Sequence, residues 1–113
     1  MTLADGIARA CASLSDVTME ISHGRPSYFV GTGSKRRNFL VLHPDGHHDK
    51  TFPHVWLAAA PGVQEELIAA FPERFFRPPY VGHRGWVALR LDEPVDWDDV
   101  AKLCADAHAA VRR

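Results

Sequence analysis

His23, Arg25 and Tyr80 are the residues whose chemistry points to a small-ligand pocket. An arginine offers a planar fork of N–H donors that matches a carboxylate or a phosphate, and a histidine changes its charge near neutral pH. The alternative is structural, because Gly24 and Pro26 shape a tight connection in which His23 and Arg25 would hydrogen-bond loop carbonyls. On the sequence alone the structural alternative is favoured, and the ligand interpretation requires the three side chains to converge on a concave pocket.

Two basic segments predict a surface for an anionic partner. Residues 35–37 are Lys-Arg-Arg, and residues 74–90 hold four arginines and no acidic residue. If both segments lie on one side of a sheet, they form a nucleic-acid-binding face whose aromatic side chains stack on bases. The alternative is that the rings fill the core and the arginines cover apolar surface with their stems. The predicted nucleic-acid-binding residues are Lys35, Arg36, Arg37, Arg74, Arg77, Tyr80, Arg84 and Trp86.

Four histidines stand close together at His43, His47, His48 and His54, with two aspartates among them. Imidazole and carboxylate groups suit zinc or nickel, but the spacing is not that of a zinc site on a fixed element. The segment is predicted to be a solvated loop between strands. We predict no metal site, no cofactor and no catalytic residues, since the sequence also lacks a phosphate-binding loop and a hydrolase nucleophile motif. The sequence favours a protein that is not an enzyme.

Length and composition indicate one globular domain over residues 1–113. The net charge of −1 excludes a protein held to nucleic acid by net charge alone, and a hydrophobic content of 46% excludes wholesale disorder. Cys11 and Cys104 have no metal-binding or disulfide-framework spacing and are predicted to be small core residues. No apolar run is long enough to cross a membrane, and the start of the chain lacks the basic region of a signal peptide, so we expect a cytoplasmic protein without a membrane partner.

The hydrophobic pattern predicts three helices and five strands. Apolar residues at three- and four-residue steps predict helices over residues 3–14, 63–71 and 96–111, the last with Asp96 as its N-cap and Asp99 at the third position of a capping box. Residues 17–22 fit either an extended strand or a short helical turn. Strands are predicted over residues 27–30, 38–42, 55–59, 74–81 and 86–91. The order α-β-β-β-α-β-β-α indicates a two-layer α+β domain, with helices on one face of an antiparallel sheet.

Two segments together resemble the MmcQ/YjbR family. Residues 21–30 contain His-Gly-Arg-Pro, and residues 74–82 read Arg-Phe-Phe-Arg-Pro-Pro-Tyr-Val-Gly and continue through residues 85–92 to Asp96-Trp97. The similarity extends over nearly the whole chain. It implies a YjbR-like fold of the α-β3-α-β2-α type, related in layout to type III secretion chaperones. The family is commonly labelled DNA-binding by structural similarity, and it supplies no catalytic residues to carry over.

These observations leave three functions open. The first is a non-enzymatic domain that binds DNA with little sequence preference through its basic, aromatic-bearing face. The second is an adaptor that docks a protein partner on a sheet edge or helix face, as the secretion-chaperone layout implies. The third is a small-ligand-binding protein with a pocket near His23, Arg25 and Tyr80. The sequence does not predict an oligomeric state.

Overall fold

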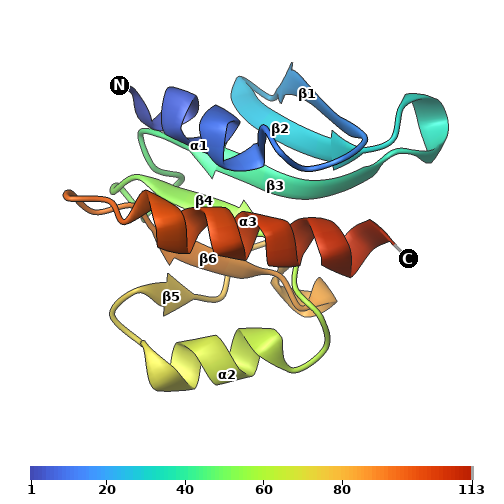
Figure 1. Cartoon of the computed structure of the whole chain (residues 1–113). Coiled ribbons are helices and arrows are strands. Elements are labelled where there is room, and N and C mark those ends of the chain that lie inside the picture. The colour runs from blue at the N-terminus through green and yellow to red at the C-terminus, as the bar shows by residue number, and fades with distance from the viewer. Residues whose placement is uncertain (113) are drawn as a thin grey trace.

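The computed structural model describes residues 1–112 of the chain. Six strands form one antiparallel sheet; the first and last helices lie side by side across one face of it, and the middle helix lies beside one edge (Figure 1). The elements are α1 (Leu3–Cys11), β1 (Val17–Ser22), β2 (Arg25–Val30), the 3-10 helix η1 (Gly33–Lys35), β3 (Arg37–His43), β4 (His54–Leu57), α2 (Val63–Ala70), β5 (Phe75–Phe76), the 3-10 helix η2 (Gly82–Arg84), β6 (Val87–Arg90) and α3 (Trp97–Arg112).

The strand order across the sheet is β1-β2-β3-β4-β6-β5. Directly paired residues of neighbouring antiparallel strands point to the same face. Two rows of paired apolar residues face α1 and α3, and all of their side chains are buried. This side is called the helix face. Its rows are Leu42, Val55, Leu89 and Phe75, and Tyr28, Leu40, Leu57 and Val87.

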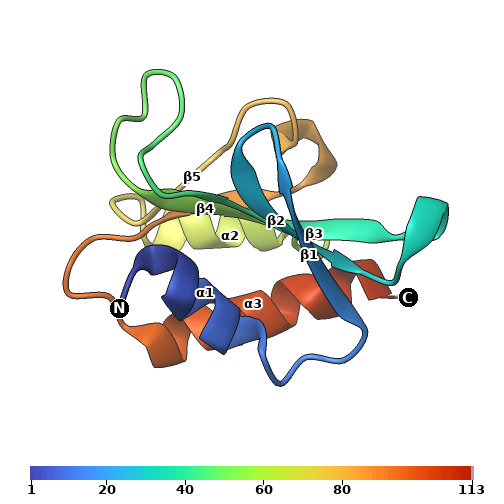
Figure 2. The same ribbon diagram turned by 90° about the horizontal axis from the view of Figure 1, so that it is seen from above.

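The alternating residues of the central strands point to the opposite side, called the open face. None of the three α-helices within residues 1–112 covers it, but three connections rise on this side of the sheet (Figure 2). They are the turn between β1 and β2, the segment over residues 44–53 and the segment over residues 77–86. The open face is defined by Ser27, Phe29, Asn38, Val41, His43, His54 and Trp56.

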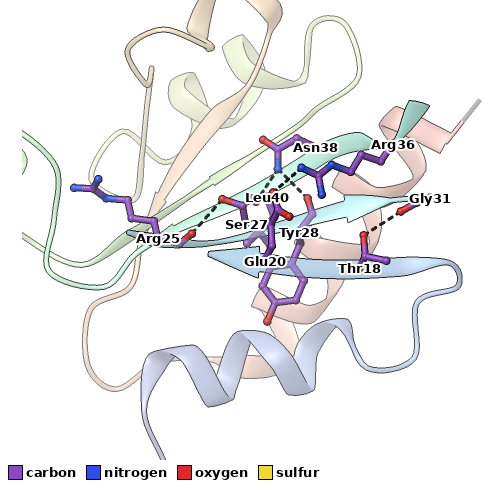
Figure 3. A network of polar contacts seen from close by, with 9 residues as sticks. All are labelled: Thr18, Glu20, Arg25, Ser27, Tyr28, Gly31, Arg36, Asn38 and Leu40. Atoms are coloured by element: carbon purple, nitrogen blue, oxygen red, sulfur yellow. Dashed lines mark hydrogen bonds and ion pairs between the residues drawn. The ribbon is translucent and has the colours of Figure 1, made fainter. Parts of the chain in front are cut away.

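A bulge in β3 sets which residues reach each face. The register between β2 and β3 shifts between Tyr28 and Phe29, so Phe39 is an extra residue without a partner on β2. Phe39 is buried against His108 of α3, with ring centroids 5.5 Å apart. The Asn38 side chain donates to the carbonyls of Tyr28 and Leu40, at 2.8 and 3.1 Å, and thereby bonds backbone groups at the bulge (Figure 3).

Both long helices begin at side-chain caps. Thr2 and Asp5 form a reciprocal capping box at α1, with N···O distances of 3.0 and 3.1 Å. At α3 the Asp96 carboxylate accepts from the Asp99 backbone N–H at 3.2 Å, which confirms the predicted N-cap. The Asp99 side chain forms an ion pair with Arg74. That pair ties the start of α3 to the connection that leads into β5.

The predicted fold class is confirmed, and the element order needs two corrections. Residues 17–22 form a full strand at the edge of the sheet, so the sheet has six strands where five were predicted. The predicted strand over residues 74–81 is reduced to Phe75–Phe76, because Pro78 and Pro79 have no N–H to donate to a strand partner. Cys11 and Cys104 are both buried and free, as predicted. No helix within residues 1–112 is both long and apolar enough to cross a membrane.

Gly6 gives a test of the contact between α1 and α3. A Cβ atom built on Gly6 lies 2.2 Å from two carbons of the Trp97 indole. Alanine normally stabilises a helix by about 1 kcal/mol over glycine, but overpacking costs about 1–3 kcal/mol. We therefore expect Gly6→Ala to lower the free energy of unfolding, measured by urea denaturation. In a Trp97→Leu background the same change should be neutral or stabilising; stabilisation in the native background would contradict this packing.

Candidate ligand pocket on the open face

The open face is hollowed between the three connections that rise from it. The hollow has a volume of about 690 Å³, within the range of about 300–1,000 Å³ usual for small-molecule sites. Strands β2, β3 and β4 form its floor, and the β1–β2 turn and the two long connections supply its walls. It is called the open-face pocket. Its lining residues are Ser22, His23, Arg25, Ser27, Phe29, Arg36, Asn38, Val41, His43, His47, Trp56 and Tyr80.

His23, Arg25 and Tyr80 all line this pocket, although they come from distant parts of the chain. The convergence that the ligand interpretation required is therefore present. His23 and Tyr80 have positive φ angles of 53° and 65°, and so does their neighbour His48 at 52°. Residues other than glycine rarely adopt this backbone conformation, which costs on the order of 1 kcal/mol or more for each residue. Three of the four such residues within residues 1–112 thus belong to the pocket rim or contact it.

Two buried polar side chains in the pocket lack a hydrogen-bond partner among the described residues. His43 is 1% exposed and Trp56 is 6% exposed. Neither ring nitrogen of His43 nor Nε1 of Trp56 bonds to any group of residues 1–112. A buried donor or acceptor without a partner costs about 1–3 kcal/mol, so most proteins satisfy such groups. Both residues line the floor of the hollow, but their nitrogens have less than 1 Å² of accessible surface, so a bound molecule completes the hydrogen bonding only when the rings turn toward it.

Aromatic rings surround these nitrogens. The His43 ring contacts the rings of both Trp56 and His54, with centroid distances of 4.1 and 4.9 Å. His47 and Tyr80 reach over from the two long connections, with centroids 5.1 and 6.4 Å from Trp56. Tyr80 is 68% exposed at the rim. Its hydroxyl bonds to Nε2 of His48 at 3.2 Å and so joins the two connections.

The charged groups of the pocket lining are cationic. Two arginines and no carboxylate belong to it. Arg36 is paired with Glu20 at 2.5 Å (Figure 3). Its guanidinium also lies over the Phe29 ring, 3.9 Å from the ring centroid. Arg25 extends away from that pair and donates to the His23 carbonyl at 3.4 Å, but has no ion pair within residues 1–112. Arg25 is therefore the cation best placed to bind an anion.

Burial keeps the histidines of this cluster neutral. It lowers the pKa of His43 to about 3, with smaller contributions from the charges of His54, Arg25 and His47. Burial also lowers the pKa of His47 and of His54. Nδ1 of His54 bonds to the Phe52 carbonyl at 2.9 Å, so the proton sits on that nitrogen. A neutral His43 offers one N–H donor and one acceptor, whereas the Trp56 indole offers a donor only.

The connection that carries Tyr80 is held in place from α2. Gln64, which is buried, donates through Nε2 to the carbonyls of Gly82 and Trp86, at 2.9 and 2.5 Å. Its Oε1 accepts from Arg77 at 3.4 Å. The Arg77 side chain also lies against Gly82, where a Cβ would come within 2.8 Å of it. Arg77 thus has a structural role in positioning the wall of the pocket.

The other predicted nucleic-acid-binding residues are spread over several parts of the surface. Arg74 pairs with Asp99, beside a hollow that Asp92, Glu93 and Asp96 also line. The segment of residues 35–37 joins β2 to β3, and β5 lies three strands away from β3, about 14 Å at the usual strand spacing. Arg74 therefore lies in acidic surroundings that the β2–β3 connection does not share.

Two of the three basic residues at positions 35–37 have partners, since Arg36 binds Glu20 and Arg37 donates to the Val111 carbonyl at 3.2 Å. Lys35 is exposed. Trp86 is 2% exposed and belongs to the hydrophobic core, with the Arg84 guanidinium 5.5 Å from its ring centroid. The predicted stacking role of Trp86 is corrected here, because its ring has no exposed face for a base. Nucleic-acid contact by the remaining residues stays a prediction.

Several residues that line the pocket or lie beside it were not predicted from the sequence. His43 and His54 were assigned to a solvated loop, but both lie at strand ends and are buried. Trp56 stands in a run of apolar residues that signals a buried strand without indicating which face each residue occupies. Within residues 1–112 no three His, Cys, Asp or Glu side chains are placed to hold a metal ion. The histidine-rich segment therefore contributes rings and hydrogen-bonding groups to the pocket.

Comparison with known proteins identifies the family. The YjbR family model matches residues 12–110, nearly the whole chain. The chain belongs to the YjbR family. The Deinococcus radiodurans protein DR2400, whose crystal structure shows a DUF419 domain, superimposes on this YjbR domain with a TM-score of 0.81. The two sequences are 21% identical, and the superposition covers 100% of this chain and 80% of that one, so the likeness shows a shared fold. No curated protein matches the sequence.

The neutral histidines predict how the stability of the YjbR domain depends on pH. Because the folded-state pKa of His43 is about 3 and its ordinary value is 6.5, the unfolded chain binds more protons between these pH values. The free energy of unfolding should therefore fall as the pH drops from 7 to 5, with His43 contributing about 2 kcal/mol. Urea denaturation at both pH values measures this. His43→Gln should lose less stability over the same interval, and an equal loss in the variant would contradict the assignment.

Proposed function

We propose that this YjbR domain is a binding protein for a small molecule, and that the open-face pocket is its binding site. The observation that carries the proposal is that His43 and Trp56, whose ring nitrogens are buried and unpartnered, line the floor of a pocket of about 690 Å³. A pocket with a largely ring-lined wall and a few convergent polar groups is the usual form of a small-molecule site. The strained backbone at His23, His48 and Tyr80 supports the same conclusion, because strain of this kind clusters at ligand sites.

Other hollows of the molecule lack this combination. The hollow between α2 and α3 is lined mainly by apolar and small residues and has no unpartnered buried polar group among the described residues. The hollow beside Arg74 is lined by acidic side chains, one of which already neutralises that arginine. The open-face pocket alone, within residues 1–112, joins concave shape to buried hydrogen-bonding groups without partners.

A protein-interaction role is a second candidate, favoured by the edge strand β1. β1 is the outermost strand of the sheet, and it exposes the apolar side chains of Met19 and Ile21. An extended peptide can add to such an edge through backbone hydrogen bonds. This candidate predicts that peptide binding perturbs β1 and leaves the open-face pocket unchanged.

The proposed pocket can be tested by NMR with simple fragments. ¹⁵N-labelled protein is titrated separately with benzamide, benzoate, imidazole and acetate, and the indole N–H signals are followed. We expect at least one fragment to shift the Trp56 indole signal, while the signals of Trp86 and Trp97, which lie outside the pocket, stay in place.

A matched pair of variants shows whether the response comes from the pocket. Val41→Phe places a ring in the floor of the pocket and should abolish the response. Met19→Phe adds the same ring on the other face of the sheet, at an exposed position of β1, and should preserve it. Dispersed spectra establish that both variants fold. A response that survives Val41→Phe, or the failure of all four fragments to shift the Trp56 signal, would contradict the proposal.

A further inference from the structure

The open-face pocket carries enough chemistry to name a class of ligand, an inference that rests on the proposed function. Four features of its lining bear on this question: the sign of its charge, the number of free cations, the shape of its walls and the hydrogen-bonding capacity of its floor. Each restricts the occupant independently of the others.

The charge of the lining requires an anion and limits its charge. With two arginines and no carboxylate, the lining attracts negative groups. Arg36 is neutralised by Glu20, however, which leaves Arg25 as the lining arginine without an ion pair within residues 1–112. One free guanidinium matches a carboxylate, which carries one charge and accepts two parallel N–H bonds. A phosphate dianion would call for more cations than the one arginine of the lining that has no ion pair within residues 1–112.

The walls favour a planar, aromatic body. Six of the twelve lining residues present rings: His23, Phe29, His43, His47, Trp56 and Tyr80. Rings prefer offset-stacked or edge-to-face contacts with other rings, which add about 0.5–1.5 kcal/mol beyond the burial of their area. A saturated ring of similar size would bury comparable area without that contribution.

The floor requires a second polar atom on the ligand. Trp56 can only donate through Nε1, and neutral His43 donates through one nitrogen and accepts through the other. When these buried rings turn toward the pocket, a hydroxyl oxygen can accept from Trp56 and donate to His43, so it can satisfy groups of both kinds. A ligand without such an oxygen would leave these groups unpaired, which is the more costly outcome.

We propose that the open-face pocket binds a planar aromatic carboxylate bearing a hydroxyl or carbonyl oxygen, with Arg25 holding the carboxylate and Trp56 and His43 bonding the second oxygen. This assigns Arg25 as the residue that selects for an anion and the ring-lined walls as the feature that selects for an aromatic body. His23, whose carbonyl accepts from Arg25, holds that guanidinium at the rim.

The class is tested with three matched probes, each titrated while the Trp56 indole signal is followed by NMR. They are 4-hydroxybenzoate, its neutral analogue 4-hydroxybenzamide, and trans-4-hydroxycyclohexanecarboxylate, which keeps the charge but lacks the aromatic ring. We expect 4-hydroxybenzoate to bind about tenfold more tightly than the amide, as a charge-assisted bond predicts, and more tightly than the saturated acid. Arg25→Gln should erase the preference for the acid over the amide.

Arg84→Gln is the matched control, because Arg84 lies against Trp86 outside the pocket lining. It should leave all three affinities unchanged. Equal binding of acid and amide, or of aromatic and saturated acid, would overturn the ligand class while the pocket itself stands. Binding of simple fragments at Trp56 together with failure of all three probes would also overturn the class. Failure of both fragments and probes would overturn the proposed function as well.

Discussion

Successive side chains of β3 and β4 point to opposite faces of the sheet. This alternation determines both the apolar core under the helices and the pocket on the open face. Leu42 and Val55 point to α1 and α3, and the residues next to them in sequence, His43 and His54, must then point to the opposite face. All four are buried, so the two central strands are covered on both sides. The helices cover one side with an apolar core. Loops and aromatic side chains cover the other side. The buried polar groups there must form their hydrogen bonds with these loops and side chains.

The two histidines meet this requirement differently. His54 donates to the Phe52 carbonyl, a bond supplied by the chain two residues earlier. His43 has no partner among residues 1–112 at either ring nitrogen, and the same holds for Nε1 of Trp56 beside it. Natural proteins keep such groups at functional sites, where optimal stability is given up for binding. The pocket on the open face is in this sense a consequence of how the sheet is buried.

The sequence predicted the architecture better than it predicted the site. Helical periodicity and the Asp96 cap were sufficient to predict α3. The family resemblance predicted the same fold as the hydrophobic pattern, and the family match confirms it. The pattern could not reveal the bulge at Phe39, since one extra residue shifts every later side chain of the strand to the other face. His43 was assigned to a loop for another reason, because Pro44 and Gly46 in the polar stretch that follows it are typical of a loop.

The site itself combines predictable and unpredictable parts. His23, Arg25 and Tyr80 have the residue types of a ligand site, and the structure brings them to one pocket. These three residues come together only because long connections follow particular paths, and no local sequence pattern specifies those paths. For example, the connection that carries Tyr80 is held by buried hydrogen bonds from Gln64 of α2. The basic residues illustrate the converse: a cluster in sequence need not form one surface, and Arg74 is neutralised by Asp99 far along the chain.

The central claim is that His43 serves binding at the expense of stability. The most direct test measures the free energy of unfolding of His43→Leu by urea denaturation at pH 8, where histidines are neutral in both states, with His54→Leu as the matched control. The account predicts that His43→Leu stabilises the domain by about 1–2 kcal/mol, because an unpartnered buried polar group is removed. His54→Leu should destabilise it, because the Phe52 carbonyl loses its donor. Destabilisation by His43→Leu equal to that of His54→Leu would show that both rings are structural, and would contradict the account.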